Sequence, residues 1–402
     1  MKILHINHSD SKGGAAIAVK RLHDLLNKRN VESYLIVGDK NYQQNNIVNL
    51  PSNFEKIKYI LKESFNRKIS RIFYSNKKNP ISLNILPSKL LKIINNMNGD
   101  VVNLHWIGKE TLSIFDIYKI NTKTVWTLHD MWPFIGTDHY SNTNDHSNGF
   151  KDKKINKYFL NLDRYIWKLK KRKFGNIEKI ICTSKWMYEK VNQSELFKGK
   201  EIKIIALPID QEFWKPFDKD VCKKFLNINP KKKTIVFGAD NFLNNNRKGF
   251  ETFVEIIKYL KRKKQFEFET ILFGETKSLD QFKNLNFKNM GYINDDYTKR
   301  LIYSAADVTV VPSTLEAFGL VAQEATHCGS PCLVFNNTGL TSVIEHKKNG
   351  YVSNFTSIND MCNGIDWCLN EMNGKENDIH LFTKKKFDTD KIIKEYLDFL
   401  ND

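Results

Sequence analysis

The sequence predicts an α/β protein built from two doubly wound parallel sheets, each in a domain of its own. Short apolar runs alternate with helical patterns along most of the chain, and a proline-bearing joint interrupts the alternation at residues 207–218. Strands and helices that alternate in this way form parallel sheets covered by helices. The length of 402 residues agrees with such a division, because one domain commonly holds about 100 to 200 residues.

The first domain is predicted to begin with a strand, a glycine loop and a helix. The apolar run 2–7 is followed by Gly13 and Gly14, and then by apolar residues at helical spacing over 16–29. Residues 54–92 are expected to be helical only in part, because prolines interrupt the pattern. Further strands are predicted at 31–39, 100–107, 122–130, 178–186 and 203–207.

The alternation restarts after the joint. Strands are predicted at 232–240, 268–275, 287–292, 307–313 and 330–336, and helices at 248–263, 296–306, 320–329 and 390–402. We therefore assign 1–207 to a first domain, 208–217 to a linker, 218–378 to a second domain, and 379–402 to a C-terminal helix that packs back on the first domain. Two such alternations imply Rossmann-like domains that face an interdomain cleft.

The composition argues against a disordered, membrane-spanning or secreted protein. Hydrophobic residues make up 41% of the chain and aromatic residues 12%, which is enough to build cores. The mean hydropathy is -0.48, and no stretch approaches the roughly 18 apolar residues of a spanning helix. The first apolar run is too short for the core of a secretory signal. The six cysteines include no CxxC pair, so we expect reduced, mostly buried thiols of a cytosolic protein.

The net charge of +18 is concentrated in two segments of the first half. Residues 54–92 and 150–174 each carry ten Lys or Arg against two acidic residues, interleaved with aromatic side chains. Such segments suit an anionic membrane surface, and a Lys-rich solvated surface explains them equally well. No nucleic-acid-reading module accompanies the charge, so we expect no nucleic acid partner.

Glycines and basic residues that open helices indicate two candidate anion sites. Gly13 and Gly14 lie where backbone amides and a helix N-terminus favour an anion. Their loop lacks the GxGxxG pattern of dinucleotide sites, and a plain tight turn explains it as well. Arg247 and Lys248 precede Gly249 at a second helix start, where two cations can clamp a diphosphate, although adjacent basic residues are also common by chance.

Carboxylates and a histidine near strand ends are the other candidates. Glu316 and Glu324 are eight residues apart. Alanine and valine flank Glu324, so we expect it in a cleft, where it can bind ribose hydroxyls, rather than on a solvent face. His129 ends an apolar strand, at the edge of a parallel sheet where ligands bind, although a lone histidine there is more often structural. The histidines that follow lack the spacing of a zinc motif, so no metal site is predicted.

The motif EAFGLVAQE at 316–324 is similar to that of glycosyltransferase family 4, whose members have the GT-B fold. Pro-Ser at 312–313 and the run CGSPCLV after the motif extend the resemblance. RKGF at 247–250 and EHKKNGYV at 345–352 support it. NLHWI and TLHDMWPF resemble the branch that builds bacterial exopolysaccharide and O-antigen. The resemblance covers most of the chain.

The resemblance implies a retaining, metal-independent glycosyltransferase of a hexosyl or related sugar. A UDP- or GDP-linked nucleotide sugar would be its donor substrate, with no cofactor. Its acceptor would be a glycan or a polyprenyl-diphosphate-linked glycan in bacterial surface polysaccharide biosynthesis, as for lipopolysaccharide or capsule. The basic segments would then meet an anionic membrane surface, which places the protein in the cytoplasm, peripheral at the inner face of the cell membrane.

Carried onto this sequence, the resemblance makes Lys248, Arg247, Glu316 and His129 the catalytic candidates. Lys248 would neutralise the leaving diphosphate, and Glu316 would hold the donor sugar and the phosphate turn. His129 would lie at the donor sugar or at the acceptor hydroxyl. The donor-binding candidates are Gly13, Gly14, Glu324, Phe318, Gly319, Leu320, Gly291 and Tyr292.

Two departures from the family pattern affect these assignments. Family members usually carry an Arg a few residues ahead of the Lys-Gly pair, whereas here Arg247 is adjacent to Lys248. The usual Gly-Gly-x-Pro-Glu turn reads Thr-Gly-Leu-Thr-Ser at 338–342. Two other classes remain: a nucleotide-sugar epimerase or hydrolase of GT-B-like fold, which needs no acceptor, and a non-enzymatic nucleotide- or RNA-binding Rossmann protein, which predicts salt-sensitive RNA binding.

Overall fold

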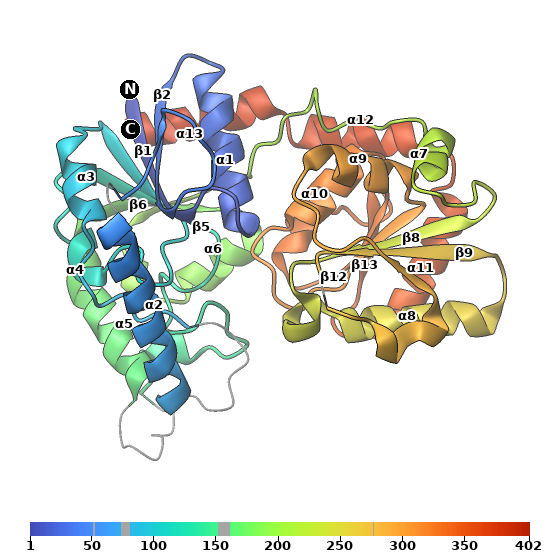
Figure 1. The fold of residues 1–402 in the computed structure, drawn as a ribbon, viewed down its shortest axis with the longest axis horizontal. Coiled ribbons are helices and arrows are strands. Elements are labelled where there is room, and N and C mark those ends of the chain that lie inside the picture. Colours follow the sequence, from blue (N-terminus) through green and yellow to red (C-terminus); the bar gives the residue numbers. More distant parts are fainter. Residues whose placement is uncertain (51–52, 74–80, 152–160, 276) are drawn as a thin grey trace. The chain divides into compact units, whose positions relative to one another are not determined.

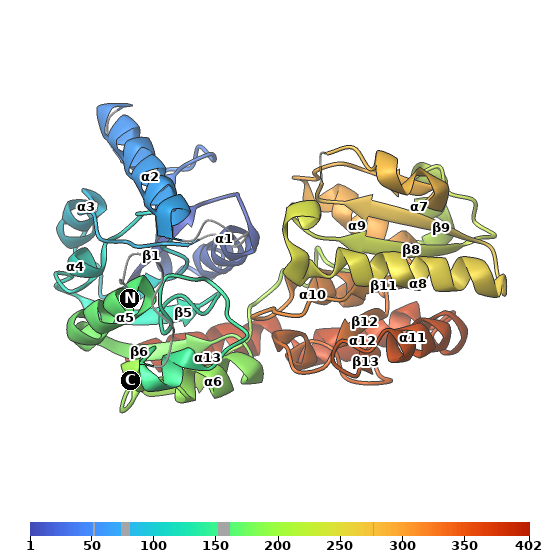
Figure 2. The same cartoon turned by 90° about the horizontal axis from the view of Figure 1, so that it is seen from below.

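The computed structural model describes residues 1–50, 53–73, 81–151, 161–275 and 277–402. The chain divides into two compact units, Met1–Pro208 with Asp390–Asp402, and Ile209–Thr389. Each unit contains one parallel sheet, and helices alternate with its strands (Figures 1 and 2). The boundary falls at the start of the segment 208–217 that was expected to be a linker: Pro208 belongs to the first unit and residues 209–217 to the second.

The first unit has a seven-stranded sheet in the order β3-β2-β1-β4-β5-β6-β7. Its strands are β1 (Lys2–Ser9), β2 (Glu32–Asp39), β3 (Ile47–Val48), β4 (Val101–Leu104), β5 (Lys123–Leu128), β6 (Ile177–Cys182) and β7 (Glu201–Ile204). Its helices are α1 (Gly14–Asn27), α2 (Asn53–Phe73), α3 (Leu90–Asn96), α4 (Ile114–Ile117), α5 (Leu162–Lys173), α6 (Lys185–Asn192) and α13 (Thr389–Asn401). The strand order reverses between β1 and β4, and doubly wound sheets bind ligands at the carboxyl ends of strands beside such a reversal.

The second unit repeats this topology with six strands in the order β10-β9-β8-β11-β12-β13. They are β8 (Lys233–Gly238), β9 (Phe268–Phe273), β10 (Phe287–Asn289), β11 (Val308–Val311), β12 (Cys332–Phe335) and β13 (Gly350–Ser353). The helices are α7 (Lys219–Phe225), α8 (Phe250–Lys263), α9 (Asp296–Ala305), α10 (Leu320–His327), α11 (Ile358–Glu371) and α12 (Glu376–Lys386). Here the reversal lies between β8 and β11.

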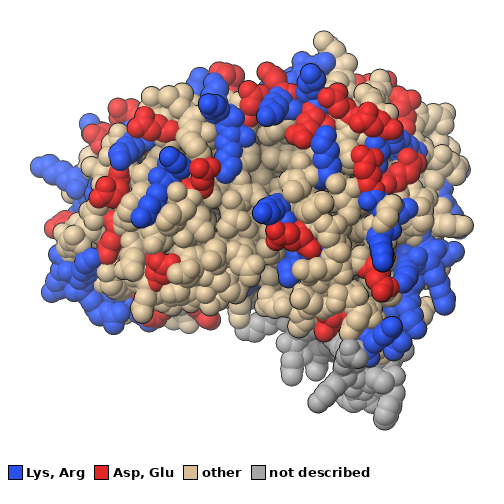
Figure 3. Space-filling view, turned by 180° about the vertical axis from the view of Figure 1, so that it is seen from behind, with Lys and Arg blue, Asp and Glu red and all other residues tan. Residues whose placement is uncertain are grey.

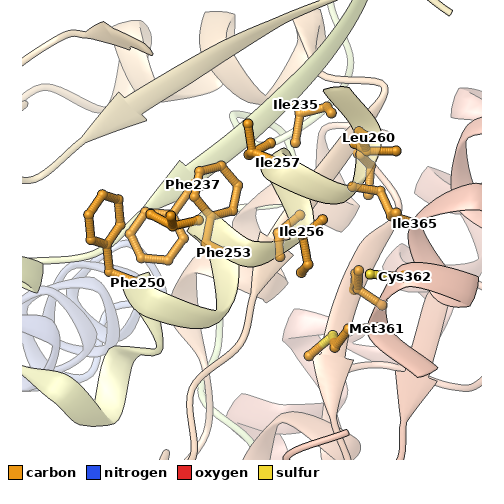
Figure 4. Packing of buried hydrophobic residues seen from close by; sticks show 14 of the residues in the cluster. Ile235, Phe237, Phe250, Phe253, Ile256, Ile257, Leu260, Met361, Cys362 and Ile365 are labelled. Carbon is orange, nitrogen blue, oxygen red and sulfur yellow. The ribbon is translucent and has the colours of Figure 1, made fainter. Parts of the chain in front are cut away.

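Aromatic packing in the second unit fixes where α8 begins. Phe237 on β8 packs against Phe250 and Phe253 on α8, and the ring centroids of Phe237 and Phe253 are 4.9 Å apart (Figure 4). All three rings are buried in a core that also includes residues of α11. Because α8 is held at its first turn, the loop that connects β8 to α8 has a defined path.

The C-terminal segment is two helices rather than the single helix expected over 379–402. Burial explains the division: α12 packs on α10 in the second unit, whereas α13 joins the first unit. On α13, Tyr396 is buried, and its hydroxyl oxygen accepts a hydrogen bond from Asn103 Nδ2 at 2.6 Å. The backbone oxygen of Phe399 accepts from Lys179 Nζ at 3.0 Å. The prediction that the chain's end packs on the first domain is thus confirmed for α13.

Each predicted strand overlaps a strand of the structure, and two strands, β3 and β13, were not predicted. Both are short edge strands, of two and four residues. All six cysteines are buried and unpaired, as expected. Within the described ranges, every helix is too short or too polar to cross a bilayer.

Candidate functional site

The second unit brings three of the predicted catalytic residues together at the reversal between β8 and β11. Arg247 and Lys248 end a short turn after β8, and Glu316 follows β11. Lys248 Nζ donates to Glu316 Oε2 at 2.6 Å, and Arg247 Nη1 lies 3.8 Å from the same oxygen. Arg247 Nη1 also donates to the backbone oxygen of Leu315 at 3.0 Å. Two cations therefore share the Glu316 carboxylate, and the charge of Asp240 also acts on Lys248.

Close backbone contacts hold these loops in register. The amide of Thr314 donates to the backbone oxygen of Arg247 at 2.8 Å. Gly249, which follows Lys248, has a φ of +74°, and a Cβ there would lie 2.0 Å from the backbone oxygen of Pro312. Only glycine fits such a position, because a side chain would be both strained and overlapping. The spacing of the Lys-Gly pair is therefore a steric requirement of this site.

A second glycine anchors the other side of the Glu316 loop. The amide of Gly339 donates to the backbone oxygen of Glu316 at 2.8 Å, and a Cβ on Gly339 would lie 2.2 Å from the backbone oxygen of Ala317. This turn is the one in which the sequence departs from the family's Gly-Gly-x-Pro-Glu. Its glycine keeps a packing role against the Glu316 loop in spite of that departure.

The ion pair is mostly shielded from solvent but still accessible. The side chains of Lys248 and Glu316 are 19% and 15% exposed. Burial by itself would raise the pKa of the Glu316 carboxyl, but the charges of Lys248 and Arg247 outweigh burial, so its pKa lies below the ordinary value. Burial lowers the pKa of Lys248, and the Glu316 carboxylate opposes this change. Each of the two side chains therefore stabilises the charged form of the other, at a site that is mostly shielded from water.

Glu324 lies on α10 and is 3% exposed, so the solvent-face alternative is wrong. Tyr303 Oη donates to Glu324 Oε2 at 3.2 Å. Burial, together with the nearby Glu324 carboxylate, raises the pKa of Tyr303 well above its ordinary value. Tyr303 therefore remains a hydrogen-bond donor to Glu324. The expected contact of Glu324 with a ribose stays a prediction.

The start of α10 places the remaining residues of the EAFGL motif. Gly319 has a φ of +111° and lets the chain enter the helix, while the Phe318 ring is buried against Phe387. Leu320 is the first helical residue. No side chain of the described residues caps α10 and no acidic residue lies in its first turn, which favours an anion at this N-terminus.

Gly291 and Tyr292 lie beyond the carboxyl end of β10. In the sheet, β9 lies between β10 and β8. The backbone oxygen of Gly291 accepts from the amide of Gly274 at 2.7 Å, which ties this turn to the end of β9. Tyr292 is 42% exposed. The structure therefore puts both residues on the same sheet edge as Lys248 and Glu316.

The first unit carries the other predicted residues. Gly13 has a φ of +88°, and no atom lies within 4 Å of where its Cβ would be, so the space beside it is open. Gly14 is exposed and begins α1, which is uncapped by any described side chain and has no acidic residue in its first turn. This loop therefore leaves room beside an uncapped helix start, and an anion bound there stays a prediction.

His129 is not a lone histidine. Its Nε2 lies 2.9 Å from His105 Nδ1, and His105 Nε2 lies 2.9 Å from His5 Nδ1. Burial lowers the pKa of His129 to about 4 and the pKa values of His5 and His105 well below the ordinary range, so all three rings are neutral near pH 7. Sequence reasoning missed His5 and His105. The available signal was a Leu-His pair at 4–5, 104–105 and 128–129, each on or just after a strand.

A second polar cluster follows β5. His139 Nδ1 lies 2.5 Å from Asp130 Oδ2, His139 Nε2 lies 2.8 Å from Ser82 Oγ, and Trp106 Nε1 donates to Asp130 Oδ2. The order Ser-His-Asp is that of a hydrolytic triad, but Ser82 is fully buried and its Oγ accepts from the amide of Lys109. We therefore assign this cluster to holding the loop after β5. Among the described residues, no group of three or more His, Cys, Asp or Glu side chains is arranged to hold a metal ion.

Family models match both units. The model described as Glycosyltransferase Family 4 matches residues 12–213, and the model described as Glycosyl transferases group 1 matches residues 218–384. Together they cover the candidate residues of both units, the glycine loop with His129 in the first and the Lys248–Glu316 pair in the second.

Curated relatives share parts of the sequence. An uncharacterised glycosyltransferase of Methanocaldococcus jannaschii is 37% identical over 113 residues, 26% of this chain and 28% of the relative. A D-inositol 3-phosphate glycosyltransferase of Paenarthrobacter aurescens is 27% identical over 139 residues, 32% of this chain and 34% of the relative. The chain therefore spans less than half the length of each of these two relatives. An uncharacterised protein of the Klebsiella pneumoniae cps region is 23% identical over 99% of this chain and 98% of its own.

Solved structures share the fold over the whole chain. HepE of Anabaena in complex with UDP and glucose has a TM-score of 0.67 at 15% identity, over 100% of this chain and 99% of its own. WaaG, a glycosyltransferase involved in lipopolysaccharide biosynthesis, has a TM-score of 0.66 at 12% identity, over 99% of each chain. At such identities the likeness shows the fold alone, and that fold is GT-B.

Glu316→Gln should remove part of the acid sensitivity of the second unit. The pKa of Glu316 is lower in the folded chain than the ordinary 4.5, so its ionised form stabilises the fold above that pH, and this contribution is lost as the pH falls through the lower folded pKa. The difference in free energy of unfolding between wild type and variant should therefore be largest at neutral pH and shrink below about pH 4.5.

Urea unfolding at several pH values, followed by circular dichroism, measures this difference. Glu371→Gln, on an exposed position of α11, is the matched control and should leave the pH dependence unchanged. A difference between wild type and Glu316→Gln that stays constant from neutral to acid pH would contradict the assigned ion pair.

Proposed function

The chain belongs to Glycosyltransferase Family 4, and on that premise we propose that it is a retaining, metal-independent glycosyltransferase. It moves a hexosyl or related sugar from a UDP- or GDP-linked donor to a glycan or a polyprenyl-diphosphate-linked glycan of a bacterial surface polysaccharide. One observation carries the proposal: Lys248, Arg247 and Glu316 meet at the carboxyl edge of the second sheet, where the strand order reverses.

The charge arrangement suits the departure of a nucleoside diphosphate. Breaking the bond between the sugar and the phosphate develops negative charge on the diphosphate, and preorganised cations stabilise this charge most in the transition state. Lys248 and Arg247 supply two such cations, and Glu316 holds Lys248 in place. The departing phosphate oxygen then accepts the proton of the acceptor hydroxyl, which attacks from the same face, so the configuration at the anomeric carbon is retained.

Lys248 and Glu316 can contact different parts of the donor, Lys248 the phosphates and Glu316 the sugar. The Glu316 carboxylate is 15% exposed and has further lone pairs for the hydroxyls of a donor sugar. The uncapped start of α10 adds backbone amides for the phosphates, and the buried Glu324 adds an acceptor for the ribose. In the first unit, Gly13 and Gly14 offer a second anion site, and His129 contacts the donor sugar or the acceptor.

Relatives support the chemical class of donor and acceptor. The structure of HepE holds UDP and glucose, and WaaG is described as taking part in lipopolysaccharide biosynthesis. The full-length relative of Klebsiella pneumoniae is described by its place in a cps region. We therefore favour a UDP-linked donor and a surface-polysaccharide acceptor for this chain, with other sugar nucleotides as the alternatives to be tested.

Lys248→Ala should lower turnover by about 100-fold or more, because one preorganised charge at a developing anion is typically worth this much. Binding of the free nucleoside should change far less. Lys258→Ala, on the exposed face of α8, is the matched control and should keep wild-type turnover. Initial rates with a panel of sugar nucleotides, first ranked by thermal shift, measure the effect. Near wild-type turnover of Lys248→Ala would refute the assignment, and isomerised or hydrolysed donor without an acceptor would indicate the epimerase or hydrolase class.

Glu324→Gln should weaken binding of the preferred nucleoside diphosphate about 10- to 100-fold, because a hydrogen bond from a ribose hydroxyl to a carboxylate is worth about 1.5–3 kcal/mol. Tyr303 can still donate to the new amide oxygen, so the variant should keep its fold. Titration calorimetry measures the affinity, with Glu371→Gln as control. Unchanged affinity would mean that Glu324 does not contact the nucleotide.

Helix α2 supports docking of the first unit on an anionic membrane surface. Ile57, Ile60, Leu61 and Phe65 share one helical face and are 46–63% exposed. The opposite face of α2 is anchored, because Tyr59 is buried and its hydroxyl oxygen lies 2.5 Å from His8 Nδ1. An exposed apolar face on a Lys- and Arg-rich helix is typical of helices that lie in a membrane interface.

The second basic segment provides further cations on the same unit. A pocket of about 310 Å³ at α5 is lined by Lys151, Arg164, Lys168 and Lys171. Glu195 also lines it and pairs with Lys171 at 2.6 Å, so this pocket is basic but not free of negative charge. Lys170 does not contribute, because it is fully buried and donates to backbone oxygens that include that of Gly136. On the face drawn in Figure 3, Lys and Arg gather in separate groups with Asp and Glu between them. Residues 74–80 and 152–160, and the side chains of Lys56, Lys58, Arg67 and Arg71, lie outside the described residues.

The chain should sediment with vesicles that contain anionic lipid at low salt, and this binding should weaken at high salt, because each engaged basic residue contributes about 1 kcal/mol. A Leu61→Glu and Phe65→Glu double variant should reduce binding by about tenfold or more, through lost apolar contact and added negative charge. Phe225→Glu, the same type of substitution at one 75% exposed position of α7, is the control. Equal partitioning to neutral and anionic vesicles, or none to either, would reject docking and leave the transferase assignment intact.

A further inference from the structure

Three imidazoles of the first unit form one hydrogen-bonded chain across three neighbouring strands. His5 Nδ1 lies 2.9 Å from His105 Nε2, and His105 Nδ1 lies 2.9 Å from His129 Nε2. His5 is opposite Asn103 in the register of β1 and β4, and Asn103 is opposite Val125 in that of β4 and β5. Each histidine is therefore displaced by two residues from its neighbour, which keeps all three on one face of the sheet.

The two ends of this histidine chain differ. At one end His5 is fully buried beneath α13, with the Tyr396 ring stacked on it and the His23 ring edge-on. His5 Nε2 is shielded from solvent and has no hydrogen-bond partner among the described residues. At the other end His129 is partly exposed, and its Nδ1 makes no hydrogen bond within the described part of the structure. The histidine chain thus has a closed end at His5 and an open end at His129.

Two hydrogen bonds in series restrict all three rings to the same tautomer. A neutral imidazole carries one N–H, so the nitrogen that accepts leaves the other nitrogen to donate. In one arrangement each ring is protonated at Nδ1: His5 donates to His105, His105 donates to His129, and His129 keeps an N–H at its open Nδ1. In the other each ring is protonated at Nε2: the direction reverses, and the open Nδ1 of His129 is a bare acceptor.

The closed end decides between these arrangements. Protonation at Nε2 throughout would leave the N–H of His5 buried without an acceptor, which folded proteins rarely tolerate. Protonation at Nδ1 throughout leaves only a lone pair of His5 unused. The rings are neutral near pH 7 because burial lowers their pKa values, and burial likewise lowers the pKa of the neighbouring His23 to about 4. The choice is therefore between tautomers and not between charge states.

We propose that His5 and His105 are positioning residues that hold His129 in its Nδ1–H form, so that His129 offers a hydrogen-bond donor to an oxygen of the substrate. This inference rests on the proposed function, in which His129 contacts the donor sugar or the acceptor. His129 is then unable to act as a base at its open nitrogen. The proton of the acceptor hydroxyl goes instead to the departing phosphate oxygen as the new glycosidic bond forms and the bond to phosphate breaks.

The tautomer of His129 can be observed without substrate. A long-range ¹H–¹⁵N spectrum of the full chain labelled at histidine, recorded near pH 7, distinguishes the protonated from the bare ring nitrogen, and a His129→Gln variant identifies the signals. We expect a protonated Nδ1 and a bare Nε2 at His129. A protonated Nε2 would overturn the inference. This readout needs no transfer activity, so a failure to find any sugar donor would count against the proposed function and not against the tautomer.

Variants at His5 separate positioning from packing. His5→Asn keeps a side-chain N–H that can donate to His105 Nε2, whereas His5→Leu has similar bulk and no donor. We expect His5→Asn to preserve the Nδ1–H form of His129 and turnover within about threefold, and His5→Leu to give a mixture of tautomers and about tenfold lower turnover. Equal loss of turnover in both variants with an unchanged His129 tautomer would show a packing role only and overturn the inference. If His5→Leu does not fold, the spectra of the wild type and of His5→Asn decide whether His129 is in the Nδ1–H form.

Discussion

The contact between Lys248 and Glu316 is the interaction on which the second unit's candidate site depends. Both side chains come from loops at the carboxyl ends of neighbouring strands, β8 and β11, so their meeting requires the reversal of strand order. The backbone enforces the meeting, because Gly249 sits against Pro312, and Gly339 sits against Ala317. A pair of opposite charges that is mostly buried is stable only if both partners are held in this way.

At the corresponding reversal of strand order, the first unit carries neutral histidines instead of an ion pair. Its corresponding strands, β1 and β4, contribute His5 and His105, which are neutral and buried, and β5 extends the row to His129. The face that carries them is covered by α13, a helix from the other end of the chain, through contacts such as that between Asn103 and Tyr396. The C-terminal helix is therefore part of the environment of a candidate site formed more than 250 residues earlier in the sequence.

Charge has several roles in this protein that its net value of +18 does not distinguish. Lys170 is fully buried over the Trp132 ring and serves the loop after β5, and Lys223 forms a buried ion pair with Asp307. Lys248 faces Glu316, whereas the lysines that line the pocket at α5 remain at the surface. Even in the last group Lys171 pairs with Glu195 at 2.6 Å, so the sum of charges in a segment overstates what a partner meets.

The sequence by itself determined the two alternating sheets, the proline-bearing boundary near Pro208, the glycines of the turns and the EAFGL motif, because these depend on local periodicity and on short-range sterics. It also indicated that Glu324 avoids solvent, from its small apolar neighbours.

Tertiary structure alone decided that Lys248 pairs with Glu316 and that His129 ends a row of three imidazoles, since residues from separate strands meet only once the strand order is set. It also divided the C-terminal segment between two units and separated the buried lysines from the exposed ones, because burial depends on contacts between elements far apart in the chain.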